Sequence, residues 1–441
     1  MTDSDFAVVE FMLTALTYTE NQEFDSDDLP PSYRAPFWSE GSIERPLSVT
    51  VDTASQATGV DRPWEAVSGL MFTDHDNFSG SLEFTDRSMA AEWYLNHAEE
   101  AQLAENPVLA AEYEDEHDVS YDLARDSNRP ARADRAFIDA LLDEYFDEDE
   151  EDEMLDLVDV RAPEEIELSL DDIVLTSEQE GEIQKIVKAI EHREYLANVG
   201  LREIGKLLFV GPPGTGKTSV ARALASKLGL PSVEVKLSMI TSQYLGETAK
   251  NVEKTFEVAK RLSPCILFID EFDFVAKTRA SDEHAAIKRA VNTLLKSIDE
   301  VSLIRDEVLL IGATNHPDQL DAAAWRRFDE IVNFPKPDSP MRADILRIVT
   351  EEMDIVDFEP DKIADLTQGL TGSDLRLVLR EAVLEALTEE RTTLTQQDLV
   401  DAVEDFEERD TLKNLDMIEG DHDALVAGGS FDSDGSDHSH D

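Results

Sequence analysis

The fold is decided by the stretch Gly211-Pro212-Pro213-Gly214-Thr215-Gly216-Lys217-Thr218. It fits G-x-x-x-x-G-K-[ST], the pattern of a loop whose backbone N–H groups hold phosphates. An apolar run at 206–210 predicts a buried strand before it, and the pattern at 219–228 predicts a helix after it. A strand, a Gly-rich loop and a helix in this order direct N–H groups and the positive end of the helix dipole at a phosphate. We therefore expect Lys217 to reach the β- and γ-phosphates of a nucleotide and the Thr218 hydroxyl to bind Mg²⁺.

The composition is strongly acidic along the whole chain. Its 441 residues include 98 acidic and 39 basic ones, which gives a net charge of −59. Binding to nucleic acid or to an anionic membrane needs clustered Lys and Arg, so the composition disfavours both partners. Acidic side chains keep a protein soluble where salt screens their mutual repulsion. The composition therefore predicts a halophile-like protein that works at high ionic strength.

Neither a disulfide nor a membrane span is expected. Cys265 is the only cysteine and lies in an apolar run, so we interpret it as a core residue. No apolar run approaches the roughly 18 residues of a membrane span. The first residues lack the basic segment of a signal peptide. These features predict a cytoplasmic protein without a membrane span.

The chain divides by composition into five parts. Trp38, Trp64 and Trp93 favour a packed N-terminal domain over a disordered arm. The acidic run at 147–153 repels itself and predicts a linker. Strand and helix patterns then alternate up to Phe334, which predicts a mainly parallel sheet, and helical patterns follow. The predicted parts are an N-terminal substrate- or adaptor-recognition domain (1–146), an acidic linker (147–170), an α/β core (171–338), a helical lid (339–408) and an acidic, disordered tail (409–441).

The expected fold is α/β: a P-loop core with a parallel sheet and a small all-α lid, preceded by a separate mixed α/β domain. The strands expected in the core are 206–210, 233–237, 265–269, 308–312 and 331–334. The N-terminal zone is expected to hold strands at 47–51 and 82–84 and helices at 87–101 and 135–146. A helix at 177–196 is expected to lead into the core.

Two acidic residues follow the apolar strand at 265–269. Asp270 is placed to hold the Mg²⁺ shell, and Glu271 can polarise a water in line with the γ-phosphate. Ligands of open α/β sheets bind at the carboxyl ends of the strands, which is where this pair stands. Two solvated acids at a strand end are the alternative in so acidic a chain.

A third group of polar residues follows the next apolar strand. Asn315 ends this strand and could orient the attacking water beside the γ-phosphate. Arg326 and Arg327 stand on a short helix soon after it and could stabilise the charge of the transition state. Taken alone, such a pair is better interpreted as surface arginines in salt bridges.

Together these segments resemble the AAA ATPases over about residues 170–407. The resemblance lies in 211–218, Ile269-Asp270-Glu271, Ala313-Thr314-Asn315 and the segment 320–329 with Arg-Arg-Phe-Asp, which is similar to the family's second region of homology. It implies that Lys217 and Thr218 are the Walker A pair, Asp270 and Glu271 the Walker B pair, and Asn315 sensor 1. It also implies that Arg326 and Arg327 act on the ATP of a neighbouring subunit, hence a homo-oligomeric ring, typically a hexamer.

The resemblance implies further contacts with ATP and with substrate. Gly372 and Ser373 correspond to the sensor-2 position, and Asp172 and Ile173 to the segment that lines the adenine pocket, although Leu175 stands where the family usually has Gly. The implied ATP-binding residues are Gly211, Pro212, Pro213, Gly214, Thr215, Gly216, Lys217, Thr218, Ser219, Asp172, Ile173, Gly372 and Ser373. Tyr244 and Leu245 resemble the aromatic and apolar pair of pore loop 1; packing of Tyr244 within its own domain is the alternative.

Three functions are consistent with these features. We expect a Mg-ATP-hydrolysing enzyme that remodels, unfolds or disassembles a protein substrate by threading it through a ring. The chain has no His-Glu-x-x-His and one P-loop, which excludes a fused zinc protease and a double ring. An ATP-gated scaffold or assembly factor with little threading is the alternative. A DNA-dependent motor is the third, and the acidic composition disfavours it.

Overall fold

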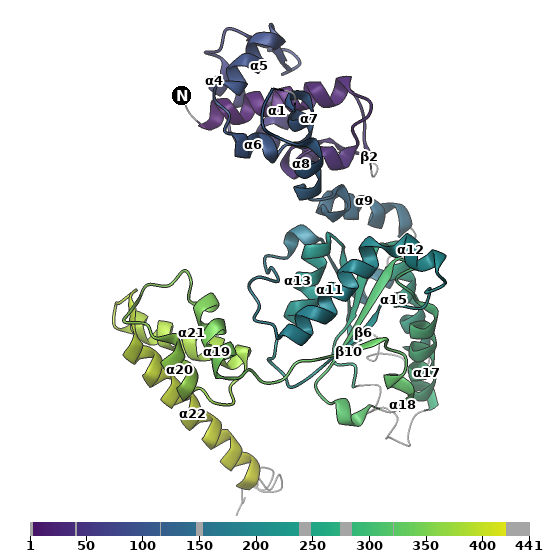
Figure 1. The fold of residues 1–441 in the computed structure, drawn as a ribbon, viewed down its shortest axis with the longest axis vertical. Helices are drawn as coiled ribbons and strands as arrows, with labels where there is room; N and C mark the ends of the chain where they lie inside the picture. The colour runs from purple at the N-terminus through teal and green to yellow at the C-terminus, as the bar shows by residue number, and fades with distance from the viewer. Residues whose placement is uncertain are drawn as a thin grey trace, which may run out of the picture. The chain divides into compact units, whose positions relative to one another are not determined.

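A computed structural model describes residues 3–39, 42–114, 116–146, 153–237, 248–273, 285–320 and 322–419 (Figure 1). By its internal contacts the chain divides into two compact units. The first comprises Met1–Gly211 and Lys217–Phe334, and the second Pro212–Gly216 and Pro335–Asp441. The Gly-rich loop thus belongs to the second unit, although the residues on both sides of it belong to the first.

A six-stranded sheet forms the centre of the first unit, in the order β10-β6-β9-β8-β7-β5. The five strands from β10 to β7 pair in parallel, and β5 pairs antiparallel to β7. This confirms the α/β fold with a mainly parallel sheet. The strands are β5 (Val158–Arg161), β6 (Lys206–Val210), β7 (Ser232–Val235), β8 (Cys265–Ile269), β9 (Val308–Thr314) and β10 (Glu330–Asn333). All five core strands were thus predicted within two residues, whereas β5 falls inside the segment expected to be a linker.

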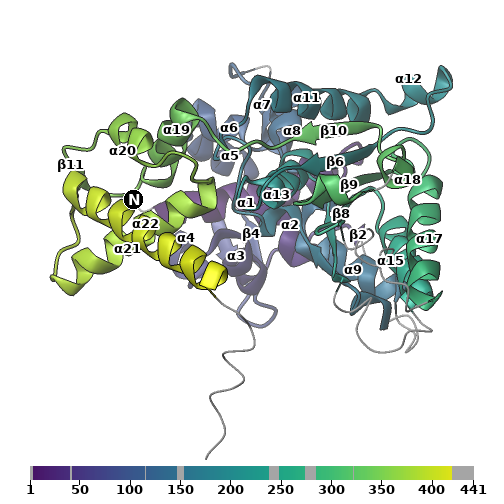
Figure 2. The same ribbon diagram turned by 90° about the horizontal axis from the view of Figure 1, so that it is seen from below.

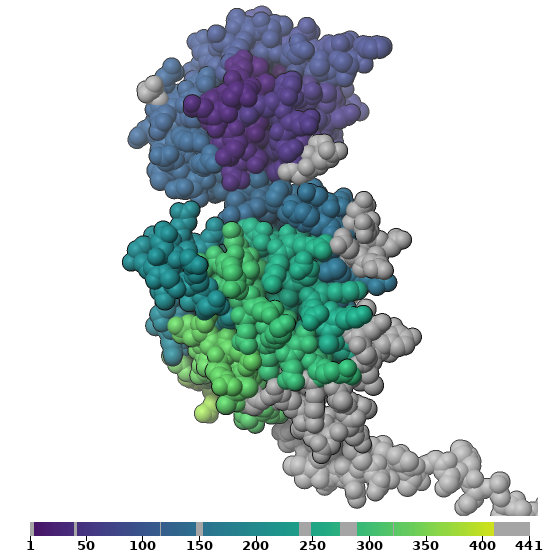
Figure 3. Space-filling view, turned by 90° about the vertical axis from the view of Figure 1, so that its right-hand side faces the viewer, coloured from purple at the N-terminus to yellow at the C-terminus, as the bar shows by residue number. Residues whose placement is uncertain are grey.

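Side chains alternate between two apolar clusters along each buried strand. In β6, Leu207 and Phe209 pack with α11 and α13, while Leu208 and Val210 pack with α15 and α17. Helices therefore lie on both faces of the sheet (Figures 1 and 2), as a parallel sheet requires. The outer faces of α15 and α17 form part of the surface in Figure 3. The helices are α11 (Ser177–Glu191), α12 (Arg193–Asn198), α13 (Lys217–Leu228), α15 (Thr248–Arg261), α17 (Ala285–Glu300) and α18 (Ala322–Trp325), with 3₁₀ turns η4 (Pro163–Glu165) and η5 (Pro317–Gln319).

Residues 3–146 fold around the apolar helix α1 (Asp3–Glu20). Val8, Val9, Phe11, Met12 and Leu13 are all buried, so neighbouring elements cover this helix on every side. The other elements are mostly short helices with two small antiparallel pairs. They are η1 (Ser26–Asp28), α2 (Pro31–Arg34), η2 (Ala35–Phe37), β1 (Trp38–Ser39), β2 (Ser42–Ile43), α3 (Val51–Thr58), α4 (Pro63–Val67), β3 (Thr73–His75), β4 (Leu82–Phe84), α5 (Arg87–Leu95), α6 (Glu100–Ala104), α7 (Pro107–Tyr113), α8 (Tyr121–Ser127), η3 (Ala131–Ala133) and α9 (Arg135–Tyr145).

One predicted strand of this region is wrong. Residues 47–51 alternate in polarity, yet only Thr50 forms an isolated bridge, to Ser81. The Thr50 side chain instead accepts a hydrogen bond from the Thr53 N–H, and helix α3 begins at Val51. A capping threonine favours a helix start over a continuing strand. The strand at 82–84 is confirmed, and the predicted helix at 87–101 ends at Leu95 and is followed by α6.

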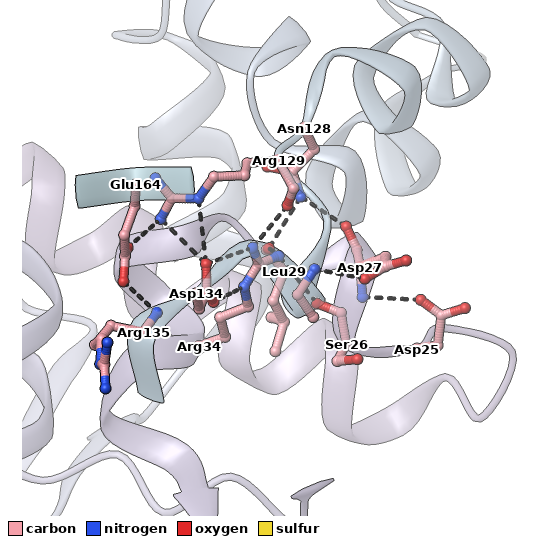
Figure 4. Close-up of polar contacts among 11 residues, drawn as sticks. Asp25, Ser26, Asp27, Leu29, Arg34, Asn128, Arg129, Asp134, Arg135 and Glu164 are labelled. Carbon is pink, nitrogen blue, oxygen red and sulfur yellow. Dashed lines mark hydrogen bonds and ion pairs between the residues drawn. The ribbon is translucent and has the colours of Figure 1, made fainter. Parts of the chain in front are cut away.

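A buried ion pair within residues 3–146 holds the segment 129–135, which contacts the sheet (Figure 4). The Arg34 side chain is completely buried, and its Nε and Nη2 donate to the Asp134 carboxylate at 2.5 and 3.0 Å. Its remaining N–H groups donate to the carbonyl oxygens of Ser26, Leu29 and Arg129. Every donor of Arg34 therefore has an acceptor, which is the condition for burying a guanidinium without a large penalty.

The contacts continue from this ion pair to the six-stranded sheet. Arg129 bridges Asp134 and Glu164, with a distance of 2.7 Å to the Glu164 carboxylate (Figure 4). The Arg135 backbone N–H also donates to Glu164, and its guanidinium donates to the Val160 carbonyl in β5. Residues 129–135 are therefore held on one side by Arg34 and on the other by elements of the sheet.

The second unit contains the expected helical domain. Its elements are α19 (Ser339–Val349), β11 (Ile355–Val356), α20 (Pro360–Leu366), α21 (Gly372–Thr388), β12 (Leu394–Thr395) and α22 (Gln396–Glu419). The parallel pair β11–β12 was not expected, and α22 continues past residue 408, where a disordered tail was predicted to begin. Among the described residues of both units, no helix is long and apolar enough to cross a membrane.

Glu10 is an acidic residue within the apolar surroundings of α1. It accepts hydrogen bonds from Asn106 Nδ2, at 3.2 Å, and from the Tyr33 hydroxyl. Burial nevertheless raises the pKa of Glu10 from 4.5 to about 7 because it penalises the carboxylate more than the two hydrogen bonds stabilise it. The folded state therefore holds this proton more tightly than the unfolded state does. The free energy of unfolding therefore falls as the pH rises from about 4.5 to about 7, and it stays lower above that range.

We expect Glu10→Gln to stabilise the protein at pH 8. The amide can still accept from Asn106 and Tyr33 but carries no charge, so the gain is about 2 kcal/mol at pH 8 and smaller at pH 5.5. Thermal unfolding in concentrated KCl at the two pH values measures it. Glu23→Gln, at an exposed position, is the matched control. An equal gain at both pH values would show that the charge of Glu10 is not the cause.

Candidate functional site

The Gly-rich loop leaves β6 at a position that only glycine fits. Gly211 has a φ of 155°, and a Cβ atom there would lie 2.1 Å from the Phe334 carbonyl oxygen. Its N–H donates to the Thr314 carbonyl at the end of β9, at 3.3 Å. The end of β10 and the end of β9 therefore fix where the loop begins.

Lys217 begins α13 directly after the loop and is buried. Its Nζ donates to the Gly211 carbonyl at 2.8 Å, so the ammonium lies back against the start of the loop. Burial lowers the pKa of Lys217, and the nearby Asp270 carboxylate partly offsets this effect. An ammonium in the first turn of a helix, near its free N–H groups, favours the binding of phosphate oxygens.

Thr218 and Asp270 meet at the carboxyl end of β8. The Thr218 hydroxyl donates to Asp270 Oδ2 at 2.9 Å, across the join between α13 and the sheet. Hard oxygen donors such as these are the ligands that Mg²⁺ prefers, and Mg²⁺ commonly takes few protein ligands beside phosphates. The pair therefore fits a magnesium ion bound together with a nucleotide.

Glu271 follows Asp270 in a conformation that is rare for a residue with a side chain. Its φ is 49°, its side chain is exposed, and its N–H donates to Asp270 Oδ1 at 2.8 Å. The left-handed conformation costs about 1–2 kcal/mol and persists where surrounding contacts impose it. Those contacts include the hydrogen bond from the Phe272 N–H to the Ala313 carbonyl, at 2.8 Å. The backbone thereby exposes the carboxylate of Glu271 at the sheet edge.

Two residues that had no predicted role of their own, Asp273 and Thr314, join the end of β8 to β9. Asp273 is buried, and Thr314 Oγ1 donates to its carboxylate at 3.3 Å. The same Thr314 oxygen accepts from the His316 N–H at 3.0 Å, directly beyond Asn315. Thr314 thus connects the backbone on the far side of Asn315 to Asp273, two residues after Glu271. An acid three residues after Asp270 was a weak signal in so acidic a chain.

The two arginines after α18 lie in different surroundings. Arg327 Nε donates to the Leu295 carbonyl at 3.0 Å, and its guanidinium pairs with Asp299 at 3.0 Å, both in α17. The Arg326 side chain is exposed, and the described residues offer it no hydrogen bond or ion pair. Phe328 packs edge-on against Phe272, at 5.2 Å between ring centres, and fixes this segment to the sheet.

The part of the loop in the second unit contacts the start of α21. A Cβ atom on Gly214 would lie 2.5 Å from Thr371 Oγ1, and its φ of 76° also favours glycine. The Ser373 N–H donates to the Gly214 carbonyl at 3.2 Å. Within this unit the loop therefore lies against the residues that the sequence assigned to the sensor-2 position, Gly372 and Ser373. Inside the loop, the Thr215 hydroxyl donates to the Pro212 carbonyl at 2.9 Å.

Three further predicted site residues lie before α13 or in its first turn. Ile173 packs against the apolar cluster that α13 shares with the sheet, and the exposed Asp172 accepts from the Ser169 N–H at 2.7 Å. Ser219 lies in the first turn of α13. Tyr244 and Leu245 lie outside the described residues, as does most of the segment between β8 and α17.

Comparison with known proteins agrees with this geometry. The family described as "ATPase family associated with various cellular activities (AAA)" matches residues 207–336, and the AAA+ lid domain matches residues 357–401. An uncharacterized AAA family ATPase, y4kL, of Sinorhizobium fredii is 38% identical over 242 residues, which are 55% of this chain and 72% of that protein.

Further relatives are the proteasome-activating nucleotidases of Methanococcus maripaludis and Pyrococcus abyssi, which are 36% and 38% identical to this chain. The alignments cover 54% and 51% of this chain and 60% and 58% of those proteins. The chain thus spans less than two thirds of their length. Residues 3–146 lie outside both family matches.

We expect Thr314→Val to weaken both stability and nucleotide hydrolysis. Valine keeps the shape but leaves Asp273 and the His316 N–H without the hydroxyl, at a cost of about 1–3 kcal/mol. Thermal unfolding and the rate of phosphate release measure the two effects. Thr255→Val is the matched control, because among the described residues this buried hydroxyl bonds to the carbonyl of Asn251 in its own helix and to no other group. Equal rates of hydrolysis in the two variants would contradict a role for Thr314 in positioning Asn315.

Proposed function

Because the chain belongs to the AAA family of ATPases, we propose that this ATP-hydrolysing enzyme works as a ring, typically a hexamer, that unfolds or remodels proteins. The observation that carries the proposal is the hydrogen bond of 2.9 Å from the Thr218 hydroxyl to Asp270. The next residue, Glu271, has an exposed side chain. It supports one complete site for Mg-ATP in each subunit.

We propose roles for the residues around this contact. Lys217 would bind the β- and γ-phosphates, and Thr218 and Asp270 would hold Mg²⁺. An ion held by these two residues would supply positive charge to offset the negative charge that develops on the phosphate oxygens. Glu271 would take the proton of the attacking water, and Asn315 would orient that water. Gly372, Ser373, Asp172 and Ile173 are proposed to contact the rest of the nucleotide, on the family resemblance.

The surroundings of Arg326 support a ring. A guanidinium that is exposed and unpaired among the described residues can act on a neighbouring subunit, whereas Arg327 is already held by Asp299 and two carbonyl groups of its own chain. We therefore propose Arg326 as the residue that reaches the neighbour's ATP. Arg327 would hold the segment that presents it.

The proposed substrate is a protein segment drawn through the ring by Tyr244 and Leu245. An aromatic side chain can grip any extended chain by apolar contact because it needs no particular partner. The relatives named proteasome-activating nucleotidase favour unfolding over nucleic-acid movement. Residues 1–146 would select the substrate or an adaptor. The net charge of −59 supports a function in concentrated salt, so molar KCl is the medium in which to measure hydrolysis and unfolding.

Replacing the proposed pore residue tests the substrate role. We expect Tyr244→Ala to keep ATP hydrolysis within about two-fold while unfolding of a tagged fluorescent protein is lost. Glu271→Gln is the control, since it should bind ATP yet stop both activities. Unfolding that survives in Tyr244→Ala would favour a ring-forming scaffold with little threading.

Mixing two inactive variants tests whether Arg326 acts between subunits. Arg326→Ala and Glu271→Gln should each lose at least about 100-fold in hydrolysis, since such arginines are worth ~10³–10⁵ in rate. In mixed rings, an Arg326→Ala subunit keeps its own Glu271 and can receive Arg326 from its neighbour. We expect the mixture to regain hydrolysis.

A mixture of Thr218→Ala with Glu271→Gln is the control, because every site in it lacks one group of its own. Arg327→Ala should mainly lower Tm, since it breaks contacts within its subunit. A mixture of Arg326→Ala and Glu271→Gln that stays inactive, although light scattering shows mixed rings, would contradict action between subunits.

A further inference from the structure

A second polar contact fastens α13 to the sheet one turn beyond Thr218. Arg222 Nε donates to Glu234 Oε1 at 2.6 Å, and its Nη2 donates to Glu234 Oε2 at 2.8 Å. Residues four apart lie on one side of a helix, so Arg222 and Thr218 face the sheet together. The guanidinium and the carboxylate thus connect α13 to β7 by two hydrogen bonds.

Glu234 lies in β7, next to β8, which Asp270 directly follows. In the parallel pairing of β7 and β8, Glu234 stands opposite Phe268, two residues before Asp270. Residues two apart in a strand share a face, and Phe268 packs with α13. Two polar contacts therefore join the same helix to the same face of the sheet: Thr218 with Asp270, and Arg222 with Glu234.

The surroundings make this link stronger than an ordinary surface ion pair. The Glu234 side chain is 14% exposed and that of Arg222 35%, so water screens the pair only partly. Arg161 in β5 lies 3.8 Å from Glu234 and pairs with Asp159 at 2.7 Å. The hydrogen bonds to Glu234 raise the pKa of Arg222, and the charges of Asp159 and Asp270 act in the same direction. The planar guanidinium fork sets an orientation that the single charge of a lysine cannot.

We propose that Arg222 is a positioning residue of the magnesium–nucleotide site. By holding Glu234 in two hydrogen bonds, it fixes the rotation of α13 over the sheet, so that the Thr218 hydroxyl stays within reach of Asp270. It touches neither the nucleotide nor the ion, and it acts through Thr218. This inference rests on the proposed magnesium site at Thr218 and Asp270.

Nucleotide affinity with and without Mg²⁺ tests the role. The probe is the non-hydrolysable ATP analogue AMP-PNP, measured by calorimetry in molar KCl with either Mg²⁺ or EDTA. We expect Arg222→Gln to weaken binding about 10-fold in Mg²⁺, or about 1.4 kcal/mol, and less than about two-fold in EDTA. Arg222→Lys, which keeps the charge but loses the fork, should fall between Arg222→Gln and the wild type.

Further variants separate positioning from charge and from stability. The reversed pair Arg222→Glu with Glu234→Arg should recover most of the affinity in Mg²⁺. Arg161→Gln is the matched control, since it also removes a cation beside Glu234 but leaves α13 attached, and it should change affinity less than about two-fold. If Arg222→Gln does not fold, Arg222→Lys and the reversed pair carry the test.

Several outcomes would overturn the inference. Equal losses in Mg²⁺ and EDTA would assign Arg222 a general structural role. A loss in Arg161→Gln as large as in Arg222→Gln would assign the effect to charge alone. A wild-type protein whose affinity does not respond to Mg²⁺ would overturn the proposed metal site itself, and this inference with it.

Discussion

The structure depends on strands that are buried on both faces. Every residue of β6, β8 and β9 is buried, so the sheet needs apolar helices on each side. Parallel strands covered in this way must be joined by helical crossovers, and their carboxyl ends then meet at one edge. Gly211, Asp270 and Asn315 each follow one of these three strands. The burial of the strands that forms the core therefore also brings the proposed site residues together.

The precision of the site comes from polar contacts around this edge. Thr314 joins β9 to Asp273, and Phe272 bonds to the β9 backbone, which holds Glu271 in its left-handed conformation. The pair of Arg222 and Glu234 adds a contact behind Thr218. These groups would not react with ATP, yet each limits how far a reacting group can move. A site built this way is sensitive to residues such as Asp273, Arg222 and Glu234, which no motif contains.

How much could be predicted from the sequence varied with the kind of element. The strands at 206–210 and 265–269 were predicted with their observed bounds, because short apolar runs between turns have few other structures available. Strand β5 was missed because its acidic surroundings resemble a linker and an edge strand is only half covered. The predicted strand at 47–51 is wrong because a local cap outweighed its alternation. Contacts such as that of Thr314 with Asp273 depend on which strands become neighbours, which local patterns do not encode.

The contacts that connect the segment 129–135 to β5 and η4 have a consequence for how this protein can be recombined. The acidic run at 147–153 looks like a natural place to exchange the N-terminal domain. The contacts of Arg129 and Arg135 with Glu164 and Val160, however, cross that boundary. A graft made there would leave the partly exposed Glu164 and the Val160 carbonyl without these arginine partners. The part of the chain that can be exchanged therefore ends after η4. A foreign N-terminal domain must include a strand that replaces β5 at the edge of the sheet.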